Sequence, residues 1–574
     1  MTGNSPAESK RWPIYRLLIV IALAIAAGRI AVIRSSEGDT AFLSANDRSR
    51  WATVAALGER GTYAIDQQIA ITNPVYRNRR PWDSIDKVRH IGRDGKQHYY
   101  SSKPPLLATV VAGLYRLVSM ASGMTLTDQP IYMARILLAL VNLPLLALFL
   151  ATTIASMDRL VRSDWAATVS AAACCFATML FPFVVSLNNH LPAAAATAMV
   201  MWLYIRAASD GATRARGELD LDSSLADASG HDLPMNRPKA QLQDVESESP
   251  LRGTPVNHRI GPSWAVLAGV AAAMAAANEL PALSMFVFWL LLFAWLDRAA
   301  IVPFAAGAVI VAAAFFGTNW IAHQSLRPPY AHRGNGNLIG EFTSLSEVPG
   351  DGFNTQIRGL LVDGGLEDSA SSLSVDASDE TGRWVVRSGE RQFALLNDGD
   401  RWQLRHWDDW YEYPGTYWKE GTRRGVDRGE SSRLTYLFHM TFGHHGLFSL
   451  TPIWLMMPIG LLVGMLADPP AMKRYNTAVL VASLVCFLFY LNRPLIDRNY
   501  GGVSICFRWL LWFAPLWLVA IAGVIDRSEA GRAKSALVLV LLACSIFSVF
   551  ASLQTPWQSP WLYQFWSFLG WISG

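Results

Sequence analysis

Apolar runs of about 20 residues, the length that a helix needs to cross the hydrocarbon core of a bilayer, recur along the whole chain. Only 16% of its 574 residues are charged, whereas about a quarter would be usual in a soluble protein. The sequence therefore predicts an all-α polytopic membrane protein with about eleven transmembrane helices. A formal net charge of +4, without a basic patch that contains interleaved aromatic residues, argues against nucleic acid as a partner.

Basic residues predict the orientation of these helices. Lys10, Arg11 and Arg16 precede the first apolar run, which we interpret as an uncleaved span with its start in the cytoplasm. The run 104–121 is short and contains Arg116, so we expect an interfacial helix there. The short basic loops then all lie inside, namely 158–164, 472–475 and 526–534. This topology places the N-terminus inside and the C-terminus outside. Further spans are expected at 132–156, 164–186, 191–206, 263–279, 281–297, 301–322, 451–467, 475–491, 509–525 and 535–553.

Polar segments divide the chain into three regions. Residues 1–323 form a membrane module with a first external loop at 35–131 that carries juxtamembrane helices. Its segment 207–261 has mixed charge and few aromatic residues, which predicts a disordered cytoplasmic loop. Residues 324–435 contain short β-type runs separated by turn residues, so we expect a small β-rich external insert. A second membrane region, 436–574, follows.

Two polar positions in the first external loop could carry chemistry. Residues 44–60 predict a helix in which Ser44 or Asn46 is the N-cap, so Asp47 lies in its first turn. There Asp47 either complements the helix dipole or has a functional role. Lys103 precedes two prolines that start the next helix, where backbone N–H groups favour an anion. It is either an interfacial lysine or a ligand for a lipid phosphate.

Further polar clusters occur at the predicted outer ends of the spans. Asn189 and His190 lie in a turn, and Glu279 is a carboxylate in apolar surroundings, which is costly and usually functional. The adjacent pair His444 and His445 is a poor metal signature, and we predict neither a metal nor a cofactor. In "RNYGGVSICFRW", glycines beside arginines permit close approach to a phosphate or sugar. The polar residues of that stretch are Arg498, Tyr500 and Arg508.

The order of these motifs resembles the C superfamily of membrane glycosyltransferases (GT-C). Closest in layout are the lipid A aminoarabinose transferases and the protein O-mannosyltransferases. "ANDRSRWATVAALGERGTY" resembles their catalytic aspartate helix, and "HYYSSKPPLLA" resembles their Lys-Pro-Pro element. The resemblance covers roughly residues 14–323. It implies that Asp47 is a general base or acceptor-positioning carboxylate, and that Lys103 contacts the polyprenyl phosphate of the donor. Where family members often carry a second acid, this chain has Asn188, Asn189 and His190.

Sugar transfer from a lipid phosphate fits the chemistry of these residues. Asp47 could deprotonate the acceptor hydroxyl, while Lys103 with Arg498 or Arg508 could stabilise the leaving phosphate. One carboxylate with a departing phosphate implies a single inverting displacement at the external face. The remaining polar residues are candidates for substrate binding, namely Asn189, His190, Glu279, His444, His445 and Tyr500.

The acceptor of such a transfer stays open between a lipid, a glycan and a protein. We expect a bacterial-type plasma membrane as the location. Two other functions remain open as alternatives. One is a transporter or lipid flippase. The other is a non-catalytic scaffold whose external insert binds a partner through the aromatic residues between Trp407 and Trp418, although those residues could equally form a buried face.

Overall fold

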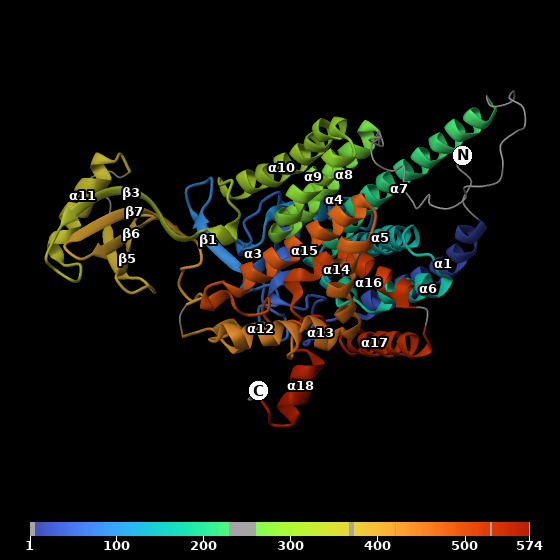
Figure 1. Ribbon diagram of the computed structural model, residues 1–574. Helices are drawn as coiled ribbons and strands as arrows, with labels where there is room; N and C mark the ends of the chain where they lie inside the picture. The colour runs from blue at the N-terminus through green and yellow to red at the C-terminus, as the bar shows by residue number, and fades with distance from the viewer. Residues whose placement is uncertain (1–5, 229–259, 367–371, 420, 529–530, 573–574) are drawn as a thin grey trace, which may run out of the picture.

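The computed structural model describes residues 6–228, 260–366, 372–419, 421–528 and 531–572 (Figure 1). In the described part, eight helical segments are long and apolar enough to cross a membrane. They are α1 (Pro6–Val32), α4 (Pro105–Ser122), α5 (Pro130–Asp158), α7 (His190–Ala228), α10 (Ile301–His323), α15 (Pro470–Leu491), the segment around α16 (Ala514–Ser528) and α17 (Arg532–Ala551). This pattern fits a polytopic membrane protein.

Shorter apolar helices account for the other predicted spans. They are α6 (Asp164–Phe176), α8 (Pro262–Asn278), α9 (Leu283–Leu296) and α14 (Met456–Ala467). Each predicted span thus coincides with helical structure, while the number that cross a membrane and their orientation stay predictions. The predicted span 164–186 is interrupted after Phe176, and a 3-10 turn that contains Pro182 follows. Proline lacks the N–H that a continuing helix would require.

Two segments differ from the expectation. The helix α4, expected at the membrane interface, qualifies as a candidate span by length and composition. It buries Ala108, Val111 and Tyr115 and exposes large apolar residues such as Leu117. This pattern suits a helix at the membrane interface as well as a helix that crosses the membrane. In the loop predicted to be disordered, α7 continues to Ala228, because this stretch contains many good helix formers. The rest of that loop, 229–259, lies outside the described residues.

The part of the predicted first external loop that precedes α4 folds into two helices and a hairpin. The helix α2 (Ala45–Arg60) has Ser44, one of the two predicted candidates, as its N-cap, and it packs on α4 with Gly58 against Tyr115. The helix α3 (Asp66–Ala70) and the antiparallel strands β1 (Lys87–Ile91) and β2 (Gln97–Ser101) follow. This hairpin was not predicted.

The insert predicted to be external is a five-stranded antiparallel sheet. One helix covers it, as Figure 1 shows at the left. Its elements are β3 (Arg333–Thr343), α11 (Asp351–Asp363), β4 (Leu373–Ala377), β5 (Arg383–Ser388), β6 (Arg391–Asp398) and β7 (Arg401–Asp409), in the spatial order β3-β7-β6-β5-β4. Phe353, Ile357 and Leu361 of α11 pack against the sheet around Trp402. The β-rich insert is therefore confirmed.

The aromatic run after β7 attaches the insert to the hairpin. Trp410 and Tyr411 are buried against Val88 and Tyr100 of β1 and β2. These residues therefore form a buried face, made against another part of the chain. The remaining helices are α12 (Arg433–Thr441), α13 (Leu447–Leu450) and α18 (Trp561–Phe568).

Candidate functional site

Polar residues from four distant segments form one hydrogen-bonded network at the ends of the helices. Arg50 on α2 donates from Nη2 to Asn189 Oδ1 at 2.8 Å. Asn189 Nδ2 donates to Glu279 Oε1 at 2.7 Å, and the same oxygen contacts His190 Nδ1. Arg508 Nη1 donates to His190 Nε2 at 2.7 Å. We call this set, Arg50–Asn189–Glu279–His190–Arg508, the ion network; it contains four of the predicted site residues.

The arginine at one end of the network determines the proton position on His190. A guanidinium can only donate, so Nε2 of His190 must accept from Arg508. The ring proton is then on Nδ1, where it is donated to Glu279. His190 and Glu279 are buried, with 0% and 5% exposure, so the carboxylate compensates the guanidinium through the imidazole in an environment that contains little water.

Glycines allow the second contact of Arg508. Its Nε donates to the carbonyl of Gly501 at 2.7 Å, and its guanidinium lies over the ring of Trp557, 5.0 Å from the centroid. Gly501 has φ = 97°, and a Cβ at this position would lie 2.6 Å from Arg508 Nε. The neighbouring Tyr500 also has a positive φ of 58°. The Tyr-Gly-Gly stretch therefore bends closely around the arginine, as only glycine permits.

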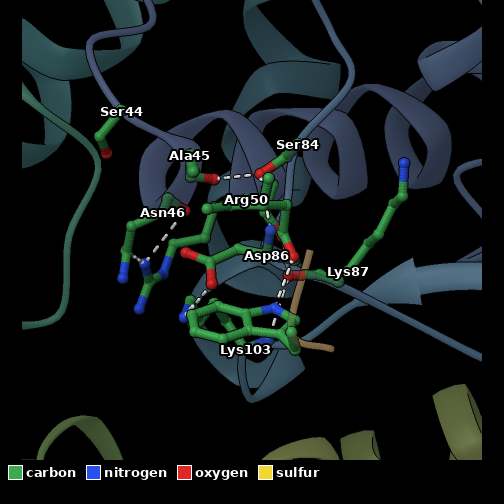
Figure 2. A network of polar contacts seen from close by, with 12 residues as sticks. Ser44, Ala45, Asn46, Arg50, Ser84, Asp86, Lys87 and Lys103 are labelled. Carbon is green, nitrogen blue, oxygen red and sulfur yellow. Dashed lines mark hydrogen bonds and ion pairs between the residues drawn. The ribbon is translucent and has the colours of Figure 1, made fainter. Parts of the chain in front are cut away.

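A partly buried ion pair joins Lys103 to Asp86. Lys103 Nζ lies 3.1 Å from Asp86 Oδ1, and Figure 2 shows Arg50 beside the pair. The carbonyl of Asp86 accepts from Ser49 Oγ at 2.5 Å and from the Ser102 amide at 3.1 Å. These bonds tie the loop before β1 to α2 and to the Lys-Pro-Pro element, which positions Asp86 against the lysine.

Three cations share this region. Burial lowers the pKa of Lys103, Asp86 raises it, and the nearby Arg50 and Arg508 lower it further. Burial also lowers the pKa of Arg50, to about 10. A small cavity of about 10 Å³ is lined by Arg50, Lys103, Tyr63 and the two prolines, among others. Such a cluster of cations with few waters is suited to hold an anion.

Asp47 lies outside both groups. It is fully buried, its Oδ2 accepts from the amide of Leu43 at 3.1 Å, and its own amide donates to Ser44 Oγ. Its Oδ1 has no hydrogen-bond partner among the described residues. Burial raises the pKa of Asp47 to about 7. Asp47 thus helps to cap α2, and it is not among the residues that line the small cavity shared by Arg50 and Lys103.

The other predicted residues form a neighbouring cluster. The ring of His445 stacks on Tyr500 with centroids 4.3 Å apart, and His444 packs against both rings. The carbonyl of His445 accepts from the amide of Phe507, next to Arg508. Arg498 is placed elsewhere, because its Nη1 donates to the carbonyl of Ser431 at 2.9 Å. Within the described ranges, no group of three or more His, Cys, Asp or Glu residues could hold a metal ion.

Sequence reasoning missed Asp86 and Arg50. Arg50 lies one helical turn after Asp47, so it could have been found by asking which side chains share a face of α2. Asp86 has no comparable signal. It precedes a strand in a polar loop, and only the tertiary contact with Lys103 reveals it.

No protein-family model matches this chain, and no curated protein matches its sequence. Its structure is similar to that of the Archaeoglobus fulgidus oligosaccharyltransferase in the apo form, with 13% identity, TM-score 0.39, and coverage of 97% of this chain and 57% of that one. The archaeal oligosaccharyltransferase AglB in complex with an inhibitory peptide and a dolichol-phosphate gives 12% identity and TM-score 0.40, covering 98% and 58%. This chain thus spans less than two thirds of the length of these archaeal proteins.

The comparison also finds the S. cerevisiae protein O-mannosyltransferase Pmt1–Pmt2 complex bound to the sugar donor, with 11% identity, TM-score 0.39, and coverage of 98% of this chain and 92% of that one. These proteins are GT-C glycosyltransferases, the class that the sequence motifs resemble. Scores of this size describe a general layout, so the argument for function is made from the residues of the site.

Proposed function

We propose that the chain is an integral-membrane glycosyltransferase that moves a sugar from a polyprenyl-phosphate donor to an acceptor at the external face. The observation that carries this proposal is the convergence of three cations from distant segments, the buried Arg50 and the half-buried Lys103 and Arg508. Burying several like charges together is costly unless an anion stabilises them. A phosphate that leaves during sugar transfer is such an anion.

The phosphate would take the place of internal counter-ions. Lys103 is paired with Asp86, and Arg508 is compensated by Glu279 through His190. We propose that Lys103 releases Asp86 when the donor phosphate binds, while Arg50 and Arg508 add directed N–H donors. We propose Arg508 rather than Arg498 as the arginine of this site, because Arg508 contacts His190 within the ion network, whereas Arg498 Nη1 donates to the Ser431 carbonyl. In this buried setting each charge contact is stronger than in water.

A carboxylate must accept the proton of the acceptor hydroxyl. Asp47 has a pKa near 7 and one oxygen without a partner among the described residues, which suits a general base. We propose Asp47 for this role and Asp86 as the counter-ion of Lys103. A single base with a departing phosphate gives an inverting displacement. Asp47→Asn would then abolish transfer and keep donor binding, whereas Asp86→Asn would change donor binding.

The position of the network favours an enzyme over a transporter or flippase. Glu279 follows the end of α8, His190 begins α7, and Arg508 begins the turn before α16. Transporters instead bind their substrates near the membrane midplane, at discontinuous helices. The scaffold alternative loses its main surface, because Trp410 and Tyr411 are buried against the hairpin. We propose a lipid, a glycan or a protein as the acceptor, and a bacterial-type plasma membrane as the location.

The decisive experiment is lipid mass spectrometry on the purified protein together with a sugar-transfer assay. Lys103→Ala is compared with Lys87→Ala, because Lys87 follows Asp86 at the start of β1 and extends away from the Asp86–Lys103 pair (Figure 2). We expect the wild type and Lys87→Ala to carry polyprenyl phosphate or its sugar ester. Lys103→Ala should lose it, and transfer should fall by about 10²–10³-fold. Equal lipid retention and transfer in all three proteins would refute the proposal.

A further inference from the structure

A cavity of about 450 Å³ lies between the β1–β2 hairpin, the end of α10 and the insert. Its lining residues differ from those of the ion network, and they come from segments that are far apart in the sequence. The volume falls in the range of sites that bind small molecules. Nothing in the proposed sugar transfer uses this cavity.

Three glutamine side chains line the cavity, each from a different segment. Gln97 belongs to β2, Gln324 follows α10, and Gln392 belongs to β6. Gln97 Nε2 donates to the carbonyl of Glu390 at 3.0 Å, and its Oε1 has no partner among the described residues. Gln324 is exposed and Gln392 is half-buried at the cavity. Each amide can both donate and accept, which matches neighbouring hydroxyl groups of a sugar.

Aromatic rings form the apolar part of the lining. Trp407 is half-buried and lies at the cavity with Phe393 and Trp410. The guanidinium of Arg383 covers one face of the Trp407 ring at 4.4 Å from its centroid. A sugar ring has an apolar C–H face and a polar rim, so it fits a site that combines flat rings with a few directed polar groups.

The charge of the lining restricts the ligand further. Arg391 is exposed at the cavity, and the described lining residues include no Asp or Glu. One guanidinium nitrogen of Arg391 donates to the carbonyl of Leu366, which leaves other N–H groups of the same side chain for a ligand. The cavity is therefore suited to neutral or acidic groups rather than to basic ones.

The backbone at Gln324 is strained. This residue has φ = 56°, in the left-handed region where glycine is favoured, and its side chain is exposed at the cavity. Strained positions of this kind are concentrated at functional sites, because the strain persists only where the surrounding structure enforces it. A glycine would cap α10 with less strain but would remove the amide.

We propose that this cavity binds a saccharide unit of a neutral or acidic glycan. Gln97, Gln324 and Gln392 bond its hydroxyl groups, Trp407 packs on its ring, and Arg391 pairs with a carboxylate where the sugar carries one. The proposal does not require that the ion network transfers sugar, and its test measures binding rather than activity.

The test uses the full-length protein in detergent and two soluble probes, cellotriose as the neutral and trigalacturonate as the acidic trisaccharide. Calorimetry should show saturable binding of at least one probe with a Kd of about 1 mM or tighter. Gln324→Gly should weaken binding about fivefold or more while leaving the melting temperature unchanged or raised, since it removes strain. This variant keeps the test informative if changes in the sheet impair folding.

Arg391→Gln should weaken binding of trigalacturonate more than that of cellotriose. The matched control is Arg401→Gln, an exposed arginine at the far end of β7, which should bind as the wild type does. Absence of saturable binding of both probes at about 10 mM would overturn the proposal. Unchanged affinity in Gln324→Gly and Arg391→Gln would overturn it as well.

Discussion

Two buried histidines lie in regions of this molecule that differ in the groups packed around them. His190 lies between a carboxylate and a guanidinium, in hydrogen-bond contact with Glu279 and Arg508. His90 lies between two rings, 4.2 Å from the centroid of Tyr100 and 4.1 Å from that of Trp410. The first region buries charges by pairing them. The second region joins the hairpin to the insert mainly by ring packing.

The stack at the insert continues beyond Trp410. His332 packs on the other side of this ring with centroids 3.5 Å apart, and its Nδ1 bonds Asp408 Oδ1 at 2.6 Å. His323 Nδ1 lies 3.0 Å from His90 Nε2. Charged groups of the ion network therefore lie where a charged ligand is proposed, whereas the joint between hairpin and insert depends on stacked rings, beside which Asp408 pairs with His332 and Arg327. Changes in the two regions should therefore have separable effects.

The largest expected effect is that of Glu279→Ala, because the variant leaves buried cations without their carboxylate. We expect a loss of about 3–5 kcal/mol in the free energy of unfolding. Thermal unfolding of the purified protein in detergent measures it. Glu341→Gln is the control, since Glu341 is exposed and bonds only Gln403 among the described residues. Equal melting temperatures of the two variants would show that the ion network does not depend on this carboxylate.

Trp410→Ala should affect the other region. The ring of Trp410 is 8% exposed and packs between two imidazoles. Its removal should weaken the attachment of the insert to the hairpin by about 3 kcal/mol. Limited proteolysis should cut the hairpin and the insert junction faster, while retention of polyprenyl phosphate stays as in the wild type. Trp571→Ala, at an exposed tryptophan, is the control. If Trp410→Ala also abolished lipid retention, the two regions would not be separable.

Acidification should destabilise the ring stack around Trp410 less than the substitution Trp410→Ala does, because all rings of the stack remain in place. Burial, opposed by a hydrogen bond with the Ile91 backbone and assisted by the nearby His332 and His98, lowers the pKa of His90 from 6.5 to about 4. Between about pH 6.5 and pH 4, the unfolded chain therefore binds a proton that the folded chain does not. Stability must then fall as the pH falls through this window.

Melting temperatures between pH 7 and pH 4 check this prediction. His90→Phe keeps a ring in the stack and should reduce the pH dependence in that window. His406→Phe is the comparison, because His406 is an exposed histidine of the insert. An identical pH dependence in the wild type and His90→Phe would assign the effect to other groups.

Gly501→Ala should have the smallest effect on stability, about 1 kcal/mol, from forcing a side chain into a left-handed conformation. The added Cβ would meet Arg508 Nε, so the arginine must shift. We expect reduced donor retention with a nearly unchanged melting temperature. The control is Gly399→Ala, which has a similar positive φ of 69° and open space around its Cβ position. Similar donor retention in both variants would show that the close contact with Arg508 is unimportant.

Local signals in the sequence were enough for the parts of the fold that depend on neighbouring residues. The helices were found from apolar runs, and the start of α2 from Ser44, whose hydroxyl accepts the amide of Asp47. The β-rich insert followed from its turn residues and strand-like runs. The hairpin carried a comparable signal in Asp94-Gly95 between β1 and β2, which was overlooked.

The site required the tertiary structure because its contacts join residues that are distant in the sequence. Arg508 and His190 are 318 positions apart, and Arg50 and Asn189 are 139 apart. The sequence by itself determined which residues were unusual for their surroundings, such as Glu279 and Lys103, since the cost of burying a charge can be read from neighbouring apolar residues. Only the tertiary structure decided that Asp86 pairs with Lys103 and that Asp47 caps a helix beside the network, because ion pairing depends on distance in space.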